Sequence, residues 1–157
     1  MSNQSDHDIV RDAASSRGDF LRALDLGVSD DCMIGMERAG ILHRVAPAIY
    51  LGSQVERHAL AEAAAWGLRH EGAVVGGLTA ALHHQLTDAF ARGVWLYTPR
   101  GTTVPRSRTA NLQVVQISPR LVVPGDDKAN GIITLTVHGA ATRIADPDRT
   151  VIDLWRY

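Results

Sequence analysis

The chain has 157 residues, of which 45% are hydrophobic and 21% are charged, and its formal net charge is −1. These values fit one ordinary domain or two small ones, and they exclude collagen, a coiled coil and general disorder. Cys32 is the sole cysteine, which excludes an internal disulfide and a zinc site closed by cysteines. No apolar run is long enough to span a bilayer, and the polar, acidic start is unlike a signal peptide. We therefore expect a cytoplasmic protein without a membrane partner.

Charge is unevenly distributed along the chain. Residues 1–54 contain five Arg and eight Asp or Glu, a net charge of −3. Residues 89–125 contain no acidic residue and five arginines. If one part of the protein meets an anion, composition points to this middle segment. Almost all cations are arginine, whose planar guanidinium suits phosphate, although codon composition alone would produce the same bias.

The N-terminal third has the pattern of short helices followed by a hairpin. Glycines end each helical segment, and Ser29 lies where an N-cap belongs. The link between the second and third helices, residues 26–29, has the length of a helix-turn-helix turn. The sequence therefore predicts a winged helix-turn-helix over residues 1–52. Its expected elements are helices over 5–16, 20–26 and 30–39 and extended segments over 41–45 and 49–51.

A mixed pattern of helices and strands follows from Ser53 onwards. Ser53 and Glu56 have the spacing of a capping box, which predicts an Ala-rich helix over 55–69. The fold class is therefore α+β, a winged helix-turn-helix followed by a small mixed α/β domain over 53–157. Its other expected elements are helices over 79–87 and 148–157 and strands over 73–75, 94–98, 112–117, 121–123, 132–138 and 142–144.

Two stretches carry a family resemblance. The first runs from Gly27-Val28-Ser29 through Gly40-Ile41-Leu42-His43-Arg44-Val45 to Ile49-Tyr50. The second comprises Gly72-Ala73-Val74, Leu78-Thr79-Ala80-Ala81-Leu82 and the Arg-Thr-x-x-Asp-Leu sequence within 145–154. In this order and spacing they resemble the AbiEi-type antitoxins, regulators paired with nucleotidyltransferase-like toxins in phage-defence toxin–antitoxin systems.

The resemblance covers nearly the whole chain and implies a function. It implies an antitoxin that also binds the promoter of its own operon as a transcriptional autoregulator and opposes a nucleotidyltransferase-like toxin. It further implies an AbiEi-like α/β domain over 53–157 whose C-terminal helices are truncated. The helix over 148–157 is amphipathic where the chain stops, which predicts either a longer parent chain or a partner that covers the helix.

The winged-helix prediction places a DNA contact on residues 30–38 and on the wing. The DNA-binding candidates are Arg22, Ser29, Ile34, Arg38, His43 and Arg44. The chain departs from the family at Asp30, Asp31, Ile34 and Gly35, where Arg or Lys is common, and at Pro47-Ala48, where a basic residue and Gly are usual. Each lost cation removes part of the phosphate-dependent affinity. The alternative is a protein-interaction module whose winged helix no longer binds DNA.

A second basic surface is predicted from Arg100, Arg106 and Arg108, which lie near Trp95 and Tyr97. This segment either binds nucleic acid or an acidic partner, or it is a solvated loop beside aromatic residues that belong to the core.

The remaining constellations favour structural roles. His83 and His84 are adjacent, so on a helix they point about 100° apart and do not share an ion easily. Three carboxylates, Asp146, Asp148 and Asp153, are better explained by turns, caps and an ion pair between Arg149 and Asp153 than by hydrolysis. We therefore predict no catalytic residues, no metal site, no cofactor and no enzyme activity. A metal-dependent hydrolase is the third hypothesis, and the oligomeric state is left open.

Overall fold

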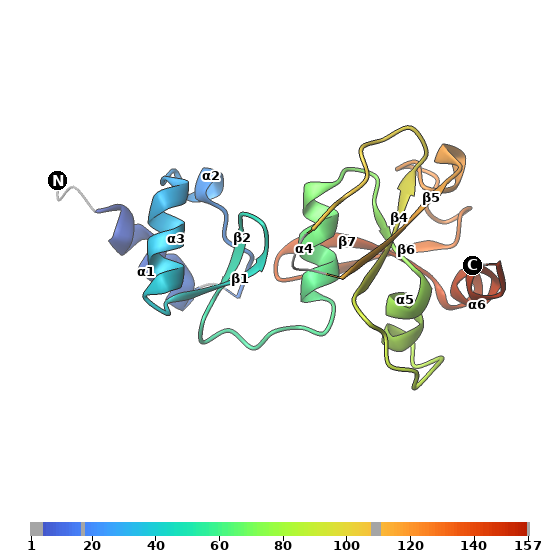
Figure 1. The fold of residues 1–157 in the computed structure, drawn as a ribbon, viewed down its shortest axis with the longest axis horizontal. Coiled ribbons are helices and arrows are strands. Elements are labelled where there is room, and N and C mark those ends of the chain that lie inside the picture. The colour runs from blue at the N-terminus through green and yellow to red at the C-terminus, as the bar shows by residue number, and fades with distance from the viewer. Residues whose placement is uncertain (1–4, 17, 108–110, 157) are drawn as a thin grey trace.

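The computed structural model describes residues 5–16, 18–107 and 111–156 and confirms an α+β protein, in which two units lie side by side (Figure 1). The first unit contains α1 (Asp6–Ser16), α2 (Ala23–Leu26), α3 (Asp30–Arg38) and the strands β1 (Leu42–Ala46) and β2 (Ile49–Gly52). The second contains α4 (Ala61–Arg69), β3 (Val74–Val75), α5 (Gly77–His83), β4 (Val94–Pro99), β5 (Leu112–Ile117), the 3₁₀ helix η1 (Pro119–Leu121), β6 (Ile132–Val137), β7 (Ala140–Ala145) and α6 (Pro147–Arg156).

Local signals set the helix boundaries of the first unit. Gly27 ends α2 in the left-handed conformation, with φ of 68°. The Ser29 hydroxyl accepts a hydrogen bond from the Cys32 N–H at 3.2 Å, which confirms the predicted cap of α3. Met33 and Met36 turn inward from α3 and pack on the hairpin, where β1 and β2 pair antiparallel.

The tip of the hairpin adopts a backbone conformation that its sequence does not favour. Pro47 and Ala48 connect β1 to β2, and Ala48 has a φ of 62°. This left-handed region favours glycine, because the side chain of an L-residue is crowded there. The backbone of the tip is therefore strained at Ala48.

The second unit is built on a five-stranded sheet with the order β5-β4-β3-β7-β6. The pairs β4–β5 and β3–β7 are parallel, whereas β3–β4 and β6–β7 are antiparallel. Helix α4 packs on one face, against Leu96 and Ile144. Tyr97 points to the opposite face, where it meets Gly77 of α5 and Asp153 of α6.

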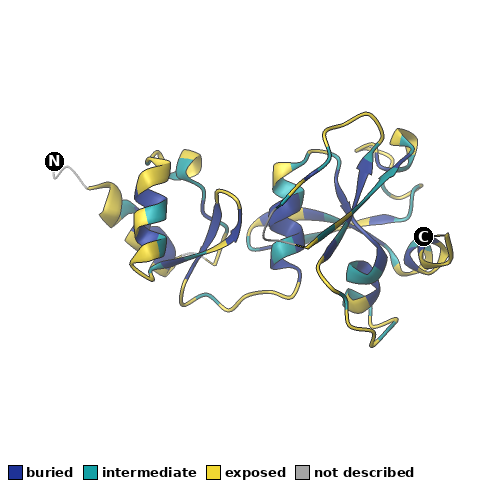
Figure 2. Ribbon diagram, in the orientation of Figure 1, coloured by how far each residue is buried: buried dark blue, intermediate teal, exposed yellow. Residues whose placement is uncertain are grey.

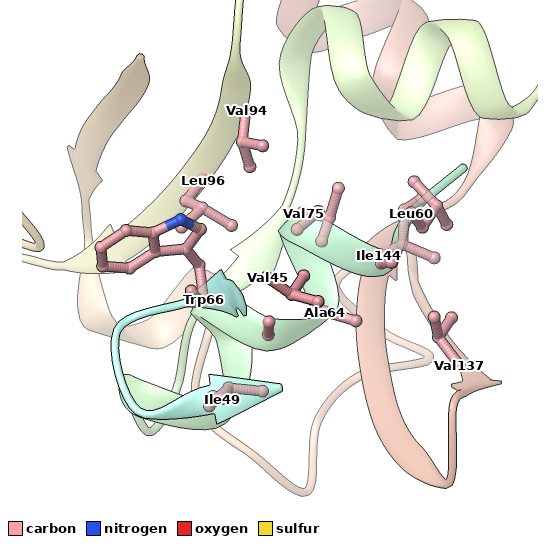
Figure 3. Packing of buried hydrophobic residues seen from close by; sticks show 14 of the residues in the cluster. Val45, Ile49, Leu60, Ala64, Trp66, Val75, Val94, Leu96, Val137 and Ile144 are labelled. Carbon is pink, nitrogen blue, oxygen red and sulfur yellow. The ribbon is translucent and has the colours of Figure 1, made fainter. Parts of the chain in front are cut away.

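A single apolar cluster joins the two units. Trp66 of α4, only 2% exposed, shares this cluster with Val45 and Ile49 of the hairpin and with Leu96 of the sheet (Figure 3). Helix α4 therefore lies between the hairpin and the sheet and packs on both (Figure 1). The hairpin is buried on two sides, because Leu42 and Tyr50 contribute to the core of the first unit.

The predicted helix over 55–69 is wrong at its start, because α4 begins only at Ala61. A contact distant in sequence explains the late start. His138 donates through Nδ1 to the Gly18 carbonyl at 2.6 Å and accepts the His58 N–H through Nε2 at 3.0 Å. The Leu60 N–H donates a hydrogen bond to Nδ1 of His58 at 3.0 Å. These bonds hold the segment before α4 outside the helix.

Other elements also differ from the predictions. The helix expected over 20–26 begins only at Ala23, because Leu21 pairs through its backbone with Tyr50 of β2. Residues 121–123 form no strand. Pro119 starts a 3₁₀ turn instead, and the Pro119 carbonyl accepts hydrogen bonds from the N–H groups of Val122 and Val123. The helix expected over 79–87 starts earlier, at Gly77, and ends at His83, before Gln85 with its φ of 57°.

Helix α6 buries polar residues and exposes apolar ones. Its buried residues are Thr150 and Asp153, whereas Ile152 and Trp155 are 60% and 90% exposed (Figure 2). Asp153 belongs to a buried polar network with Arg149 and Tyr97. Arg149 Nε donates to Asp153 Oδ2 at 3.1 Å, and its guanidinium lies 5.6 Å from the Tyr97 ring centroid. Burial, and then the Asp153 charge, raise the pKa of Tyr97 far above its ordinary value.

We expect alkali to weaken the fold through Tyr97. Its pKa is higher in the folded than in the unfolded chain, so its contribution is complete below the ordinary tyrosine pKa of about 10 and is lost as pH rises above it. Urea unfolding at about pH 8 and about pH 10.5 measures the loss. Tyr97→Phe should flatten the decline, and an equal decline in both proteins would contradict the prediction.

We expect Gly52→Ala to destabilise the protein by about 1–3 kcal/mol, because the added Cβ would collide with the Ala14 carbonyl at the end of α1. Gly35→Ala is the matched control, since open space surrounds Gly35 within α3 and alanine favours a helix by about 0.5–1 kcal/mol. Chemical denaturation of both variants checks the opposite signs.

Candidate nucleic-acid interface

The outer face of α3 is open to solvent. Asp30, Asp31 and Arg38 are exposed on this helix and Ile34 is half-buried, while the second unit lies beyond the hairpin (Figure 2). A partner therefore reaches this face without any displacement of the second unit.

Neighbouring carboxylates pair two of the predicted DNA-binding arginines. Arg22 Nε lies 2.7 Å from Asp25 Oδ2, and Arg44 Nη2 lies 2.6 Å from Glu37 Oε2. Arg44 also lies over the Tyr50 ring at 5.3 Å, and its hydrogen bond to Glu37 raises its pKa. Arg38 is exposed, and the described residues show no ion pair for it. Two of the three arginines predicted to bind DNA are therefore held in ion pairs, whereas Arg38 is not paired within the described residues.

His43 and Arg44 point to opposite sides of the hairpin. Successive residues of a strand point to opposite faces, so Arg44 points to α3 and His43 to the second unit. Burial lowers the pKa of His43, and the charges of Arg57 and His138 lower it further. Its Nε2 is buried and lacks a hydrogen-bond partner within the described ranges. The structure thus separates His43 from the face that holds Arg38 and Arg44.

The aromatic residues of the second predicted basic surface, Trp95 and Tyr97, are not available to a ligand for stacking. Tyr97 is buried and Trp95 is half-buried against Gly77, so both belong to the packing of the sheet. Arg100 and Arg106 are exposed after β4, and Arg108 lies outside the described residues. What this segment offers a ligand is charge and not a stacking platform.

Two arginines that the sequence analysis did not single out lie near the hairpin. Arg69 Nη1 donates to the Pro47 carbonyl at 2.5 Å, and its guanidinium lies 5.9 Å from the Trp66 ring centroid. Arg57 lies 3.9 Å from Glu62. Neither position carries a local signal, because each meets the hairpin only in the folded chain.

The three candidate carboxylates have different surroundings. Asp146 Oδ1 accepts the Arg149 N–H at 2.8 Å at the start of α6, and Asp148 is exposed. The predicted pair of Arg149 and Asp153 is confirmed. Arg149 Nη1 also donates to the carbonyls of Leu121 and Asn130 at 2.9 and 2.8 Å. The Arg149 guanidinium therefore connects α6 to η1 and to the turn before β6, and this structural role accounts for the pairing of Arg149 with Asp153.

The paired histidines have separate partners. His84 Nε2 donates to the Ala145 carbonyl at 2.7 Å. His83 lines a cavity of about 620 Å³ that also contains Arg57, His58 and Glu62. Burial, and then His84 and His58, lower the pKa of His83. In residues 5–16, 18–107 and 111–156, no three His, Cys, Asp or Glu side chains come together in a way that suits a metal ion.

We expect Asp153→Ala to cost about 3–5 kcal/mol of stability, because it leaves Arg149 buried without its carboxylate. Asp148→Ala changes an exposed carboxylate on the same helix and should stay within about 0.5 kcal/mol of the parent. Denaturant unfolding compares the two variants. An equally small effect of both would show that the buried pair does not hold α6.

Comparisons with known proteins establish only the fold. No protein-family model and no curated protein matches the chain. The chain is similar to the solved structure of the RV2827C protein from Mycobacterium tuberculosis, with a TM-score of 0.61 over 93% of this chain and 16% sequence identity. It spans 58% of the length of that protein. None of the helices in the described part of the chain has the length and apolarity that crossing a bilayer requires.

Proposed function

We propose that the protein is a DNA-binding antitoxin and transcriptional autoregulator of a toxin–antitoxin operon. In this proposal the first unit is a winged helix-turn-helix, with α3 as the recognition helix and β1–β2 as the wing. The observation that carries it is the position of α3. This helix is capped at Ser29 after a tight turn from α2, is open on its outer face, and lies beside a hairpin that carries Arg44.

The exposed ion pairs are compatible with phosphate binding. A solvent-exposed pair contributes only about 0–1 kcal/mol, so a phosphate can displace Glu37 from Arg44 at small cost. Arg38 needs no such exchange with a described carboxylate. Phosphate contacts would set the position of α3, and the few polar groups on its outer face would read base edges.

The antitoxin part of the proposal rests on the family resemblance of the second unit. The Gly72-Ala73-Val74 stretch leads into β3, and the Arg-Thr-x-x-Asp-Leu sequence lies on α6. We propose that this unit opposes a nucleotidyltransferase-like toxin in the cytoplasm. A gene for such a toxin directly beside this reading frame would support the pairing.

Arg44→Ala should weaken binding to operon and random duplexes alike, by roughly five- to tenfold near 0.1 M salt, and should reduce the salt slope by about 0.9. Glu37→Gln should have the opposite effect, because it frees Arg44 and removes a charge that repels phosphate. Fluorescence anisotropy with labelled duplexes over a salt series measures both. Binding to the upstream operon sequence no tighter than to random duplex would remove the repressor function.

The second candidate is a protein-interaction module. It is favoured by Asp30 and Asp31 on the outer face of α3 and by the pairing of Arg22 and Arg44 with carboxylates. Co-purification of the toxin with the full chain, together with no shift of promoter DNA, would select this function over the first.

A further inference from the structure

A groove of about 330 Å³ lies where the hairpin meets α4. Arg44 and Pro47 line it from the hairpin, Glu62 and Trp66 from α4, and Arg57 from the segment between them. Ser107 closes the groove from the segment that follows β4. The fold thus brings the wing and the second basic segment, more than fifty residues apart in the sequence, to one place.

The groove and its edge are rich in guanidinium groups. Arg44 and Arg57 line it, and Arg69 borders it through its bond to the Pro47 carbonyl and its contact with the Trp66 ring. Arg106 is exposed and directly precedes Ser107. The second basic segment therefore reaches the groove at Ser107, beside the exposed Arg106.

Two carboxylates near the groove offset part of its positive charge. Glu37 pairs with Arg44, and Glu62 lies 3.9 Å from Arg57 at the outer limit of an ion pair. Both pairs are partly exposed, where such pairs add little to stability. The arginines outnumber these two carboxylates, so an incoming anion finds net positive charge.

We propose that this groove binds the sugar–phosphate backbone of duplex DNA beside the segment contacted by α3. The inference rests on the proposed function and extends its footprint from the first unit to the second. Arg44 links the two parts, because it pairs with Glu37 of α3 and also lines the groove. Beyond Arg44 the groove offers Arg57, and Arg106 is exposed next to Ser107, which also lines the groove. A protein with an acidic segment is the competing partner, and the position of the groove next to α3 favours DNA.

The test uses the full chain, a labelled operon duplex and a random duplex of equal length, with affinity measured over a salt series. Arg57→Ala and Arg106→Ala should each lower affinity for both duplexes by roughly five- to tenfold near 0.1 M salt and reduce the slope by about 0.9. The double variant should reduce the slope by roughly twice as much. Arg57→Lys keeps the charge and should restore most of the slope.

Arg120→Ala is the matched control, because Arg120 is an exposed arginine on η1 and its loss changes the net charge equally. Thermal unfolding of every variant verifies that the fold is retained. If Arg57→Ala and Arg106→Ala behave like Arg120→Ala while Arg44→Ala weakens binding, the groove is not a DNA contact and the inference alone fails. If the parent protein binds neither duplex at low salt, the proposed function fails, and the inference fails with it.

Discussion

The arrangement of this protein depends on the packing of one helix against two partners. Trp66 and the alanines of α4 fill the space between the hairpin and the five-stranded sheet, so a single apolar cluster contains Val45, Ile49, Leu96 and Ile144. The hairpin contributes Leu42 and Tyr50 to the other core as well. Because the same two strands belong to both cores, the first unit has a defined orientation on the second. Only this orientation places the segment after β4 beside the hairpin.

The arrangement of charged side chains determines how strongly each surface attracts an anion. In the first unit, Arg11, Arg22 and Arg44 are paired with nearby carboxylates. The outer face of α3 carries two aspartates at its start. Those aspartates also have a local role, since carboxylates in the first turn complement the helix dipole. In the second unit, the segment after β4 carries arginines without neighbouring acids in the sequence. Neither surface is strongly basic by itself, so the proposed DNA contact draws on both units.

Elements with local signals were predictable from the sequence. Gly27, Ser29 and Gly40 mark the ends of α2 and α3, and the alternating pattern predicts β5 with its observed bounds. Elements whose ends depend on distant contacts were not. The bond between His58 and His138 spans 80 residues and replaces the expected start of α4. Helix α6 was predicted to within one residue of each end, together with its pair of Arg149 and Asp153. The contacts of its buried polar face with Tyr97 and with the carbonyls of Leu121 and Asn130 were not predictable, because they come from distant segments.

The candidate site follows the same division. Arg38 and Arg44 were identified from their place in a familiar order of elements, and Ser29 from its capping position. The ion pair with Glu37 joins a helix to a strand, and the contacts of Arg69 join α4 to the hairpin. Contacts between separate elements cannot be predicted from residue type and spacing. The sequence therefore identified the individual arginines but not the groups that pair with them.

The strained tip of the hairpin has a consequence for recognition. Proline fixes the backbone at position 47, Ala48 has fewer accessible conformations than glycine, and the Pro47 carbonyl is held by Arg69. A glycine tip would be more relaxed but would lose more entropy when a ligand ordered it. A tip with proline and alanine therefore has less conformational entropy to lose on contact with a ligand, at a small cost in the stability of the free protein.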